Sequence, residues 1–327
     1  MAGTPLVKVL DKGKDLVADP NCQIISVDIM KEVNSIPRAR LVLSDGDSAK
    51  QKFDLSNEAS FEPGKEIEIQ LGYMGEPDKA VTVFKGIVIK HGVKADKNTS
   101  SLIVDLRDKA IRLTTKRKNV VFRNKKDSDI LKEILKKWNP EIENTLFKHR
   151  EMVQYYCTDW DFVLSRADLN GHWVLADDGS MTIKRHLIKN LGKKKPDCRV
   201  EYGKSPIYDF EMEADIRGLY KSVQSKGWDI KEQKLSESPK KKSKTLVQGN
   251  LKPDQMAEVL GSGMYHLVDA IDLDKKELEV WADSKMRKSC LSMLKGRVRI
   301  PGDANIKPGG VIEVKGVGDR FNGKTYV

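Results

Sequence analysis

The sequence predicts a mainly β protein in which two related β-barrel modules flank a small α+β domain. A repeated phrase carries this prediction: residues 61–70 read FEPGKEIEIQ, and residues 306–315 read IKPGGVIEVK. In each copy a Pro-Gly turn leads into a strand of alternating apolar and polar residues. An aromatic-x-Gly strand follows both copies, at 84–86 and 321–323, with a shorter connection in the second. The phrase therefore predicts a duplicated module, the alternative being coincidence between two generic hairpins.

The first module is expected to span residues 1–111. Short apolar runs in this region alternate with polar residues, and turn signals at 44–46 and 73–77 separate some of them. Several short strands at this spacing are typical of a closed barrel or a small sandwich. The expected strands are 24–29, 38–43, 66–70, 81–84, 86–89 and 101–106.

The small α+β domain is expected to span residues 112–200, because the apolar period changes after Val121. Asp127 or Ser128 can cap a helix whose apolar residues recur on one face as far as Trp138. The Asn-Pro pair at 139–140 is expected to end this helix, because a residue that precedes proline disfavours helical geometry.

A second helix is predicted to begin at Thr158, where Asp161 can reach back to the cap, and to end at 170–171. A hairpin is expected to follow over 172–184, with its turn at 177–179. Trp138 and Trp160, one from each helix, are expected in the core of this domain.

The second β-barrel module is expected to span residues 201–327. Strands are predicted at 208–213, 219–228 and 297–300, and a helix at 273–294. Residues 231–244 are lysine-rich, contain a proline and lack apolar periodicity, so a mobile loop is expected there. Because the chain stops at Val327 inside an apparent strand, we expect the natural protein to continue into a needle domain.

Composition narrows the function classes. The chain has 327 residues, a net charge of +11, 39% hydrophobic residues and 33% charged residues. No apolar run is long enough to cross a membrane, and charges interrupt the N-terminus where a signal peptide would need an apolar core. Cytoplasmic assembly without a signal peptide is expected, with any export by another route. Lysine runs without interleaved aromatic residues favour solvated loops, and a nucleic-acid partner is the less favoured alternative.

The sequence predicts no catalytic, cofactor-binding or metal-binding residue. The cysteines and histidines are scattered and lack the spacing of a zinc site. Phosphate-binding glycine loops and nucleophile elbows are also missing from the sequence. These scattered residues are Cys22, Cys157, Cys198, Cys290, His91, His149, His172, His186 and His266.

Three segments carry a resemblance to a known family. Residues 127–135 read DSDILKEIL, residues 153–166 read VQYYCTDWDFVLSR, and residues 170–173 read NGHW. In this order they resemble the VgrG spike proteins of type VI secretion and related contractile injection systems, and the late control D tail hub proteins of phages. The flanking strands at 84–88 and 220–228 agree with that family, although NGHW departs from its usual acidic-Gly-aromatic turn.

The resemblance implies a structural role. Members of the family carry two related β-barrel modules and form homotrimers, which act as the baseplate hub between a hexameric inner tube and a piercing needle. The implied partners are the inner tube protein, baseplate proteins, and a spike tip or effector cargo. The protein is then a non-enzymatic component of an exported particle. The alternative is a carrier of an effector or cell-wall hydrolase domain that lies beyond residue 327.

Overall fold

The computed structural model describes residues 3–18, 22–97, 99–230, 232–244, 246–269 and 273–327. It is 43% strand and 19% helix, which confirms the prediction of a mainly β chain with helical insertions. The chain divides into two compact units. Unit 1 comprises residues 1–117, 135–140 and 175–182, and unit 2 comprises the rest. The three predicted domain boundaries and the barrel form of the modules remain predictions.

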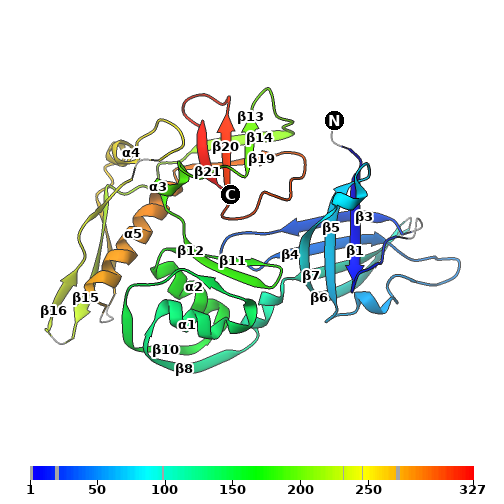
Figure 1. Cartoon of the computed structure of the whole chain (residues 1–327), viewed down its shortest axis with the longest axis horizontal. Helices are drawn as coiled ribbons and strands as arrows, with labels where there is room; N and C mark the ends of the chain where they lie inside the picture. The colour runs from blue at the N-terminus through cyan, green and yellow to red at the C-terminus, as the bar shows by residue number, and fades with distance from the viewer. Residues whose placement is uncertain (1–2, 19–21, 98, 231, 245, 270–272) are drawn as a thin grey trace. The chain divides into compact units, whose positions relative to one another are not determined.

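Unit 1 is built on a seven-stranded antiparallel sheet in the order β2-β1-β5-β6-β7-β4-β3 (Figure 1). The sequence interpretation missed β1, where only Val9 is fully buried. The strands are β1 (Pro5–Asp11), β2 (Lys14–Asp15), β3 (Ile24–Met30), β4 (Arg38–Ser44), β5 (Glu66–Tyr73), β6 (Val81–Ala95) and β7 (Ser100–Arg107). Two short 3₁₀ helices lie between strands of this sheet, η1 (Ala59–Phe61) and η2 (Pro77–Lys79), and a third, η3 (Lys109–Thr114), follows β7.

The core of unit 1 follows from the alternation of side chains along these strands. In β7 every second residue is fully buried, namely Leu102, Val104 and Leu106, while the residues between them are partly exposed. Because successive side chains of a strand point to opposite faces, this pattern gives the sheet one apolar face. Phe61 and Phe84 fill the centre of the resulting core, and neither is exposed.

The repeated phrase forms the same hairpin in both halves of the chain. Gly64 N donates to Val88 O at 2.8 Å, and Val88 N donates to Lys65 O at 2.9 Å. In the second copy Gly309 N donates to Val327 O at 2.8 Å, and Val327 N donates to Gly310 O at 3.0 Å. The strands after each turn continue in matching antiparallel register, β5 with β6 and β20 (Val311–Lys315) with β21 (Gly323–Tyr326).

Two details of the duplication differ from the sequence prediction. Gly86 lies opposite Ile67, and the equivalent position of the second hairpin is Thr325, opposite Ile312. The two aromatic-x-Gly segments are therefore not equivalent, since Gly323 lies opposite Val314 and not opposite Ile312. The strand on the far side also differs, since β1 is antiparallel to β5 whereas β13 (Cys198–Glu201) is parallel to β20.

Both turn glycines adopt backbone angles that disfavour other residues. Gly64 has a φ of 98° and Gly309 a φ of 75°. An alanine at either position would be strained, so we expect Gly64→Ala and Gly309→Ala each to lower the free energy of unfolding by about 1–2 kcal/mol. Denaturant titration of each variant measures this loss.

Gly75→Ala is the matched control, because Gly75 lies in a turn without positive φ and has open space around it. We expect a change within about 0.5 kcal/mol for the control. Equal stability of all three variants would show that the turns do not need glycine.

The α+β region belongs mostly to unit 2, and its strands lie around two helices (Figure 1). Both ends of α2 and the first residue of α1 lie where the sequence predicts, whereas α1 stops earlier than predicted. Thr158 caps α2 by accepting from Asp161 N at 3.1 Å, and Gly171, with a φ of 65°, follows its C-terminal residue Asn170. The elements of this part of the chain are β8 (Arg117–Lys126), α1 (Asp127–Ile134), η4 (Lys136–Trp138), β9 (Glu141–Ile142), β10 (Lys148–Thr158), α2 (Asp159–Leu169), β11 (His172–Asp177) and β12 (Ser180–Arg185).

The two tryptophans behave differently from each other. Trp160 is buried, as predicted, whereas Trp138 is only half-buried. The reason is that α1 ends at Ile134 and η4 continues the chain as a tighter turn, which rotates Trp138 off the apolar face. Phe122, Ile130 and Phe162 form the local core instead.

The C-terminal part of unit 2 is a set of small sheets around one long helix, α5 (Lys275–Leu291), which packs against β15. The helix ends earlier than predicted, and the residues from Leu294 onward form a strand. The remaining elements are α3 (Ile188–Leu191), β14 (Asp209–Ala214), β15 (Ser222–Asp229), β16 (Lys234–Glu237), β17 (Lys241–Lys242), α4 (Pro253–Val259), β18 (Met264–Val268) and β19 (Leu294–Arg299).

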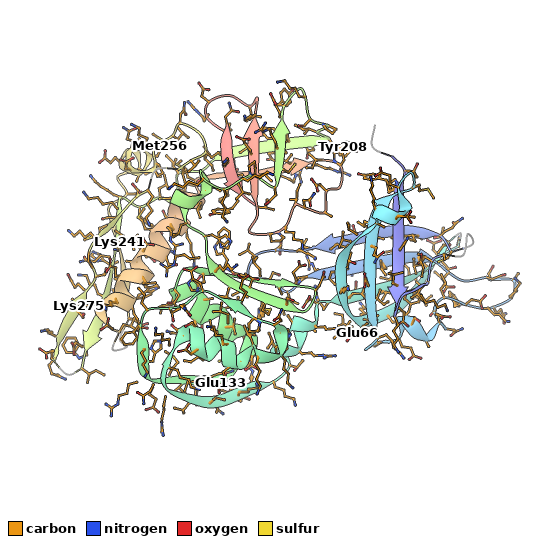
Figure 2. The ribbon with its side chains drawn as sticks, in the orientation of Figure 1. Glu66, Glu133, Tyr208, Lys241, Met256 and Lys275 are labelled. Carbon is orange, nitrogen blue, oxygen red and sulfur yellow. The ribbon has the colours of Figure 1, made fainter. Side chains whose placement is uncertain are left out.

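The prediction of a loop over 231–244 is wrong for six of its residues. Residues 234–237 and 241–242 form β16 and β17, and both pair with β15. The lysines are held by acidic partners on α5, Lys241 by Glu279 and Lys244 by Asp283. Figure 2 shows Lys241 beside this helix. Composition misled here because strand pairing and ion pairs, not apolar alternation, fix the segment. Residue 231, the first of the expected loop, lies outside the described residues.

Candidate functional site: a buried ionic cluster and an open cleft

One histidine of the scattered set meets charged partners in the interior of unit 2. Asp127 begins α1, His149 lies on β10, Arg166 on α2 and Glu277 on α5, and all four side chains are nearly or fully buried. His149 Nε2 lies 3.1 Å from Asp127 Oδ1, and His149 Nδ1 lies 3.6 Å from Glu277 Oε1. We call these four residues the buried cluster.

Arg166 holds the buried cluster together. Its Nε donates to Asp127 Oδ1 at 2.7 Å and its Nη2 donates to Asp127 Oδ2 at 2.9 Å, which is a two-pronged contact. The same Nη2 lies 3.5 Å from Glu277 Oε1. Asn170 Nδ2 adds a third hydrogen bond to Asp127, at 2.8 Å. One guanidinium thus faces two carboxylates supplied by two different helices.

The pKa values of the two carboxylates of the buried cluster are shifted in opposite directions. Burial by itself would raise the pKa of Asp127, but hydrogen bonds from His149 and Arg166 and the charge of Arg166 hold that pKa well below its usual range. Burial raises the pKa of Glu277, and the charges of His149 and Arg166 offset this only in part. Asp127 is therefore the firmly ionised member of the pair.

The spacing of Asp127, His149 and Glu277 would allow a metal ion, because one ligand atom from each lies within 4.8 Å of the others. The geometry of Arg166 argues against a metal. Its guanidinium binds both oxygens of Asp127 and approaches Glu277, so it already supplies the positive charge that an ion would bring. We assign the buried cluster a structural role.

A second polar contact lies between α2 and α5. Ser284 Oγ donates to Asp168 O at 3.0 Å, and Arg287 Nη2 donates to Gly171 O at 3.3 Å. Arg287 is only 4% exposed, and burial lowers its pKa although Asp283, which accepts from its Nε at 3.0 Å, opposes the shift. Two hydrogen bonds from α5 to backbone carbonyls at and just after the C-terminal end of α2 therefore join the two helices.

The remaining histidines of this region are neutral structural groups. Burial lowers the pKa of His172 and of His186 to about 4 in each case. His186 stacks on Trp173 with ring centroids 4.1 Å apart, and Tyr326 meets both rings edge-on. No disulfide joins the four cysteines, which are Cys22, Cys157, Cys198 and Cys290.

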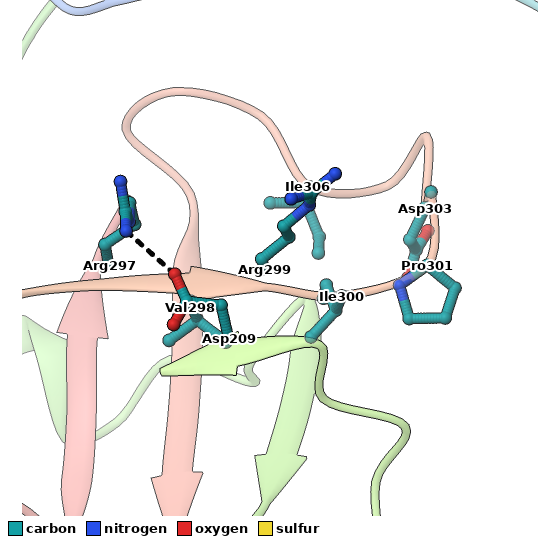
Figure 3. Close-up of a pocket in the computed structure, with 9 residues that line it drawn as sticks. Asp209, Arg297, Val298, Arg299, Ile300, Pro301, Asp303 and Ile306 are labelled. Carbon is teal, nitrogen blue, oxygen red and sulfur yellow. Dashed lines mark hydrogen bonds and ion pairs between the residues drawn. The ribbon is translucent and has the colours of Figure 1, made fainter. Parts of the chain in front are cut away.

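An open cleft of about 510 Å³ lies at the end of β19 (Figure 3). Arg297 and Arg299 of β19 line one side, and the loop after the strand, with Pro301 and Ile306, arches over the other. Arg297 Nη2 lies 2.8 Å from Asp209 Oδ2, and the picture draws this contact within the cleft. The lining combines charged and apolar side chains and faces solvent, which suits a surface contact better than enclosure of a small molecule.

Sequence reasoning found neither the buried cluster nor the cleft. Asp127 and Arg166 stand in two of the segments that carry the family resemblance, but His149 and Glu277 lie outside them. Only the fold brings the four side chains together. In the part of the chain that the structure describes, no helix is long and apolar enough to span a membrane.

Comparisons with solved structures place the fold among phage tail proteins. The 43 kDa tail protein of prophage MuSo2 from Shewanella oneidensis superimposes with a TM-score of 0.67 at 12% identity, covering 99% of this chain and 92% of that one. A tail protein from Neisseria meningitidis MC58 gives 0.64 at 14% identity, covering 95% and 86%. Prophage tail protein gp18 from Listeria monocytogenes EGD-e gives 0.53 at 13% identity, covering 94% and 84%.

No curated protein matches the sequence. A family model described as the Alg8 N-terminal domain matches residues 2–327. This match covers nearly the whole chain. The chain belongs to the Alg8 N-terminal domain family.

Proposed function

We propose that this chain is a structural hub of a contractile, phage-tail-like particle. In this role it forms a homotrimer that joins a hexameric inner tube to the base of a piercing needle. Its partners would be the inner tube protein, other baseplate proteins and a spike tip or its cargo. The fold of phage tail proteins supports a place in such a particle.

The observation that carries this proposal is the repeated hairpin. Each half of the chain holds one copy with the same turn hydrogen bonds and the same register. A three-fold assembly of a chain with two similar modules presents six similar elements around its axis. Such an assembly can meet a six-fold tube ring without a symmetry mismatch, and the duplication then has a mechanical purpose that needs no catalytic residue.

The mass of the purified chain in solution tests the trimer. We expect light scattering coupled to size exclusion to give about three times the chain mass of 36.9 kDa. Class averages of negatively stained particles should show three-fold symmetry with six similar lobes. A monodisperse monomer at every soluble concentration would contradict the proposal.

A further inference from the structure

Two strands of unit 2 carry rows of opposite charge. β14 and β19 pair antiparallel, and the register sets Asp209 opposite Arg299, Glu211 opposite Arg297 and Glu213 opposite Lys295. Alternate residues of a strand share a face, so the acidic row and the basic row lie side by side on one face. We call these two strands the charged ribbon.

The charged ribbon is incompletely paired within one chain. β14 and β19 form a two-stranded sheet, and among the described residues no third strand pairs with either outer edge. Of the six charges, only Arg297 and Asp209 form an ion pair in the described part of the chain. The charges without an ion pair there are Glu211, Glu213, Lys295 and Arg299. A two-stranded sheet alone is marginally stable in water, so the ribbon gains from a further strand.

The basic strand is also accessible from the side. Arg297 and Arg299 line the open cleft, and both side chains are exposed (Figure 3). Its volume of about 510 Å³ leaves room for side chains of another molecule next to β19. The other strand offers the complementary surface, since Glu211 and Glu213 are exposed as well.

We propose that the charged ribbon is a contact between copies of this chain, in which β14 of one copy lies along the outer edge of β19 of the next. The acidic row of one copy then faces the basic row of its neighbour and repeats the pairing found within each chain. A contact between two different surfaces of the same chain is head-to-tail and closes into a ring when the rotation permits. The inference rests on the self-assembly part of the proposed function and names the surface responsible.

Charge complementarity selects a second copy as the occupant. Neighbouring strands lie about 4.8 Å apart, so a partner that contacts one row also interacts electrostatically with the other row. A nucleic acid or a purely acidic segment would be attracted by β19 and repelled by the acidic row of β14. A partner that carries both rows in the same register satisfies all six charges, and the chain itself is such a partner.

A chain with its two rows exchanged tests this inference. The exchange keeps opposite charges facing each other within the chain, so folding is preserved. It reverses the charges met by a wild-type neighbour. The substitutions are Asp209→Lys, Glu211→Arg, Glu213→Lys, Lys295→Glu, Arg297→Glu and Arg299→Glu.

Native mass spectrometry of the co-expressed chains gives the readout. We expect wild type and the exchanged chain each to assemble with itself, while mixed oligomers are depleted about tenfold or more relative to random mixing, because like charges would face each other across the contact. Isotope-labelled and unlabelled wild type provide the control for random mixing. Random mixing of the exchanged chain with wild type would overturn the inference.

A smaller exchange covers the case in which the fully exchanged chain does not fold. Glu213→Lys with Lys295→Glu exchanges a single facing pair and keeps opposite charges opposite each other within the chain. Mixed oligomers of this variant with wild type should be depleted, by less than with the full exchange. The matched control, Lys136→Glu with Lys137→Glu, reverses two exposed lysines outside the ribbon and should mix with wild type at random. A pair-exchanged chain that mixes like this control contradicts the inference.

The two proposals fail in different ways. A wild-type chain that remains monomeric would contradict both the proposed trimer and the proposed ribbon contact. A wild-type trimer that mixes freely with the exchanged chain would leave the proposed function standing and overturn the ribbon contact alone. Assembly that weakens as NaCl rises supports the ribbon contact, because exposed charges are screened by salt.

Discussion

Arg166→Met should lower the free energy of unfolding by about 3–5 kcal/mol, the largest effect expected of a single substitution in this chain. Arg166 is the group that neutralises Asp127 and approaches Glu277 in a buried setting. Removal of the guanidinium leaves two buried carboxylates facing one histidine. A buried charge without its partner has lost its hydration and has no ion pair to compensate for that loss. Removal of one partner therefore lowers the free energy of unfolding strongly.

Chemical denaturation measures the loss, and two further variants show its origin. Arg217→Met removes an arginine from an exposed pair with Asp215, and we expect a change within about 1 kcal/mol. Adding Asp127→Asn to Arg166→Met should recover part of the stability, because the stranded charge is removed. Equal losses for Arg166→Met and Arg217→Met would show that the buried cluster does not contribute as described.

Acid titration of the same variant gives a second readout with a defined sign. Asp127 has a pKa held below its value in the unfolded chain, so its contribution to stability is present above about pH 3.9 and is lost as pH falls further. Glu277, whose pKa is raised by burial, acts in the opposite direction. Without Arg166 the pKa of Asp127 should rise, and wild type should therefore lose more of its stability than Arg166→Met does as pH falls through the acid range.

Local signals were the ones that sequence reasoning read correctly. The cap at Thr158, the glycine after α2 and the Pro-Gly turns each depend on residues within a few positions of one another. The turn at 177–179 is also local, because Asp178 and Gly179 both adopt positive φ in the hairpin between β11 and β12. Local backbone chemistry determines these features, so they can be predicted without knowledge of the rest of the fold.

Features that depend on distant partners were missed. The buried cluster joins α1 to α5, and the charged ribbon pairs β14 with β19 across the whole intervening helix and its sheet. The lysine-rich segment at 231–244 was expected to be mobile, because its partners Glu279 and Asp283 lie on a helix that comes later in the sequence. The sequence pattern around a charged residue does not indicate where its partner lies in the fold. From composition alone, such a residue is therefore predicted to lie on the solvated surface.

The glycine of the first aromatic-x-Gly strand has a structural reason that the repeat did not show. Gly86 lies in β6, at the centre of the seven-stranded sheet, beside the buried ring of Phe84. A Cβ at this position would lie 2.5 Å from Arg107 O and 2.6 Å from the Phe84 ring. Neither approach is tolerable, and the first involves backbone that the β6–β7 pairing holds in place.

We therefore expect Gly86→Ala to lower the free energy of unfolding by about 2–3 kcal/mol, as overpacking of a filled core does. Gly92→Ala is the matched control, since Gly92 lies in the same strand with nothing within 4 Å of its would-be Cβ. Its effect should stay within about 0.5 kcal/mol. Denaturant titration of both variants makes the comparison.

A double variant separates the two clashes at Gly86. Phe84→Leu frees space beside the ring and leaves Arg107 O in place, so combining it with Gly86→Ala should recover only a minor part of the loss. Full recovery would assign the strain to the ring alone. If Gly86→Ala proved as harmless as Gly92→Ala, the close approach of β6 and β7 at this point would be refuted, and with it the reason for a glycine in the middle of a buried strand.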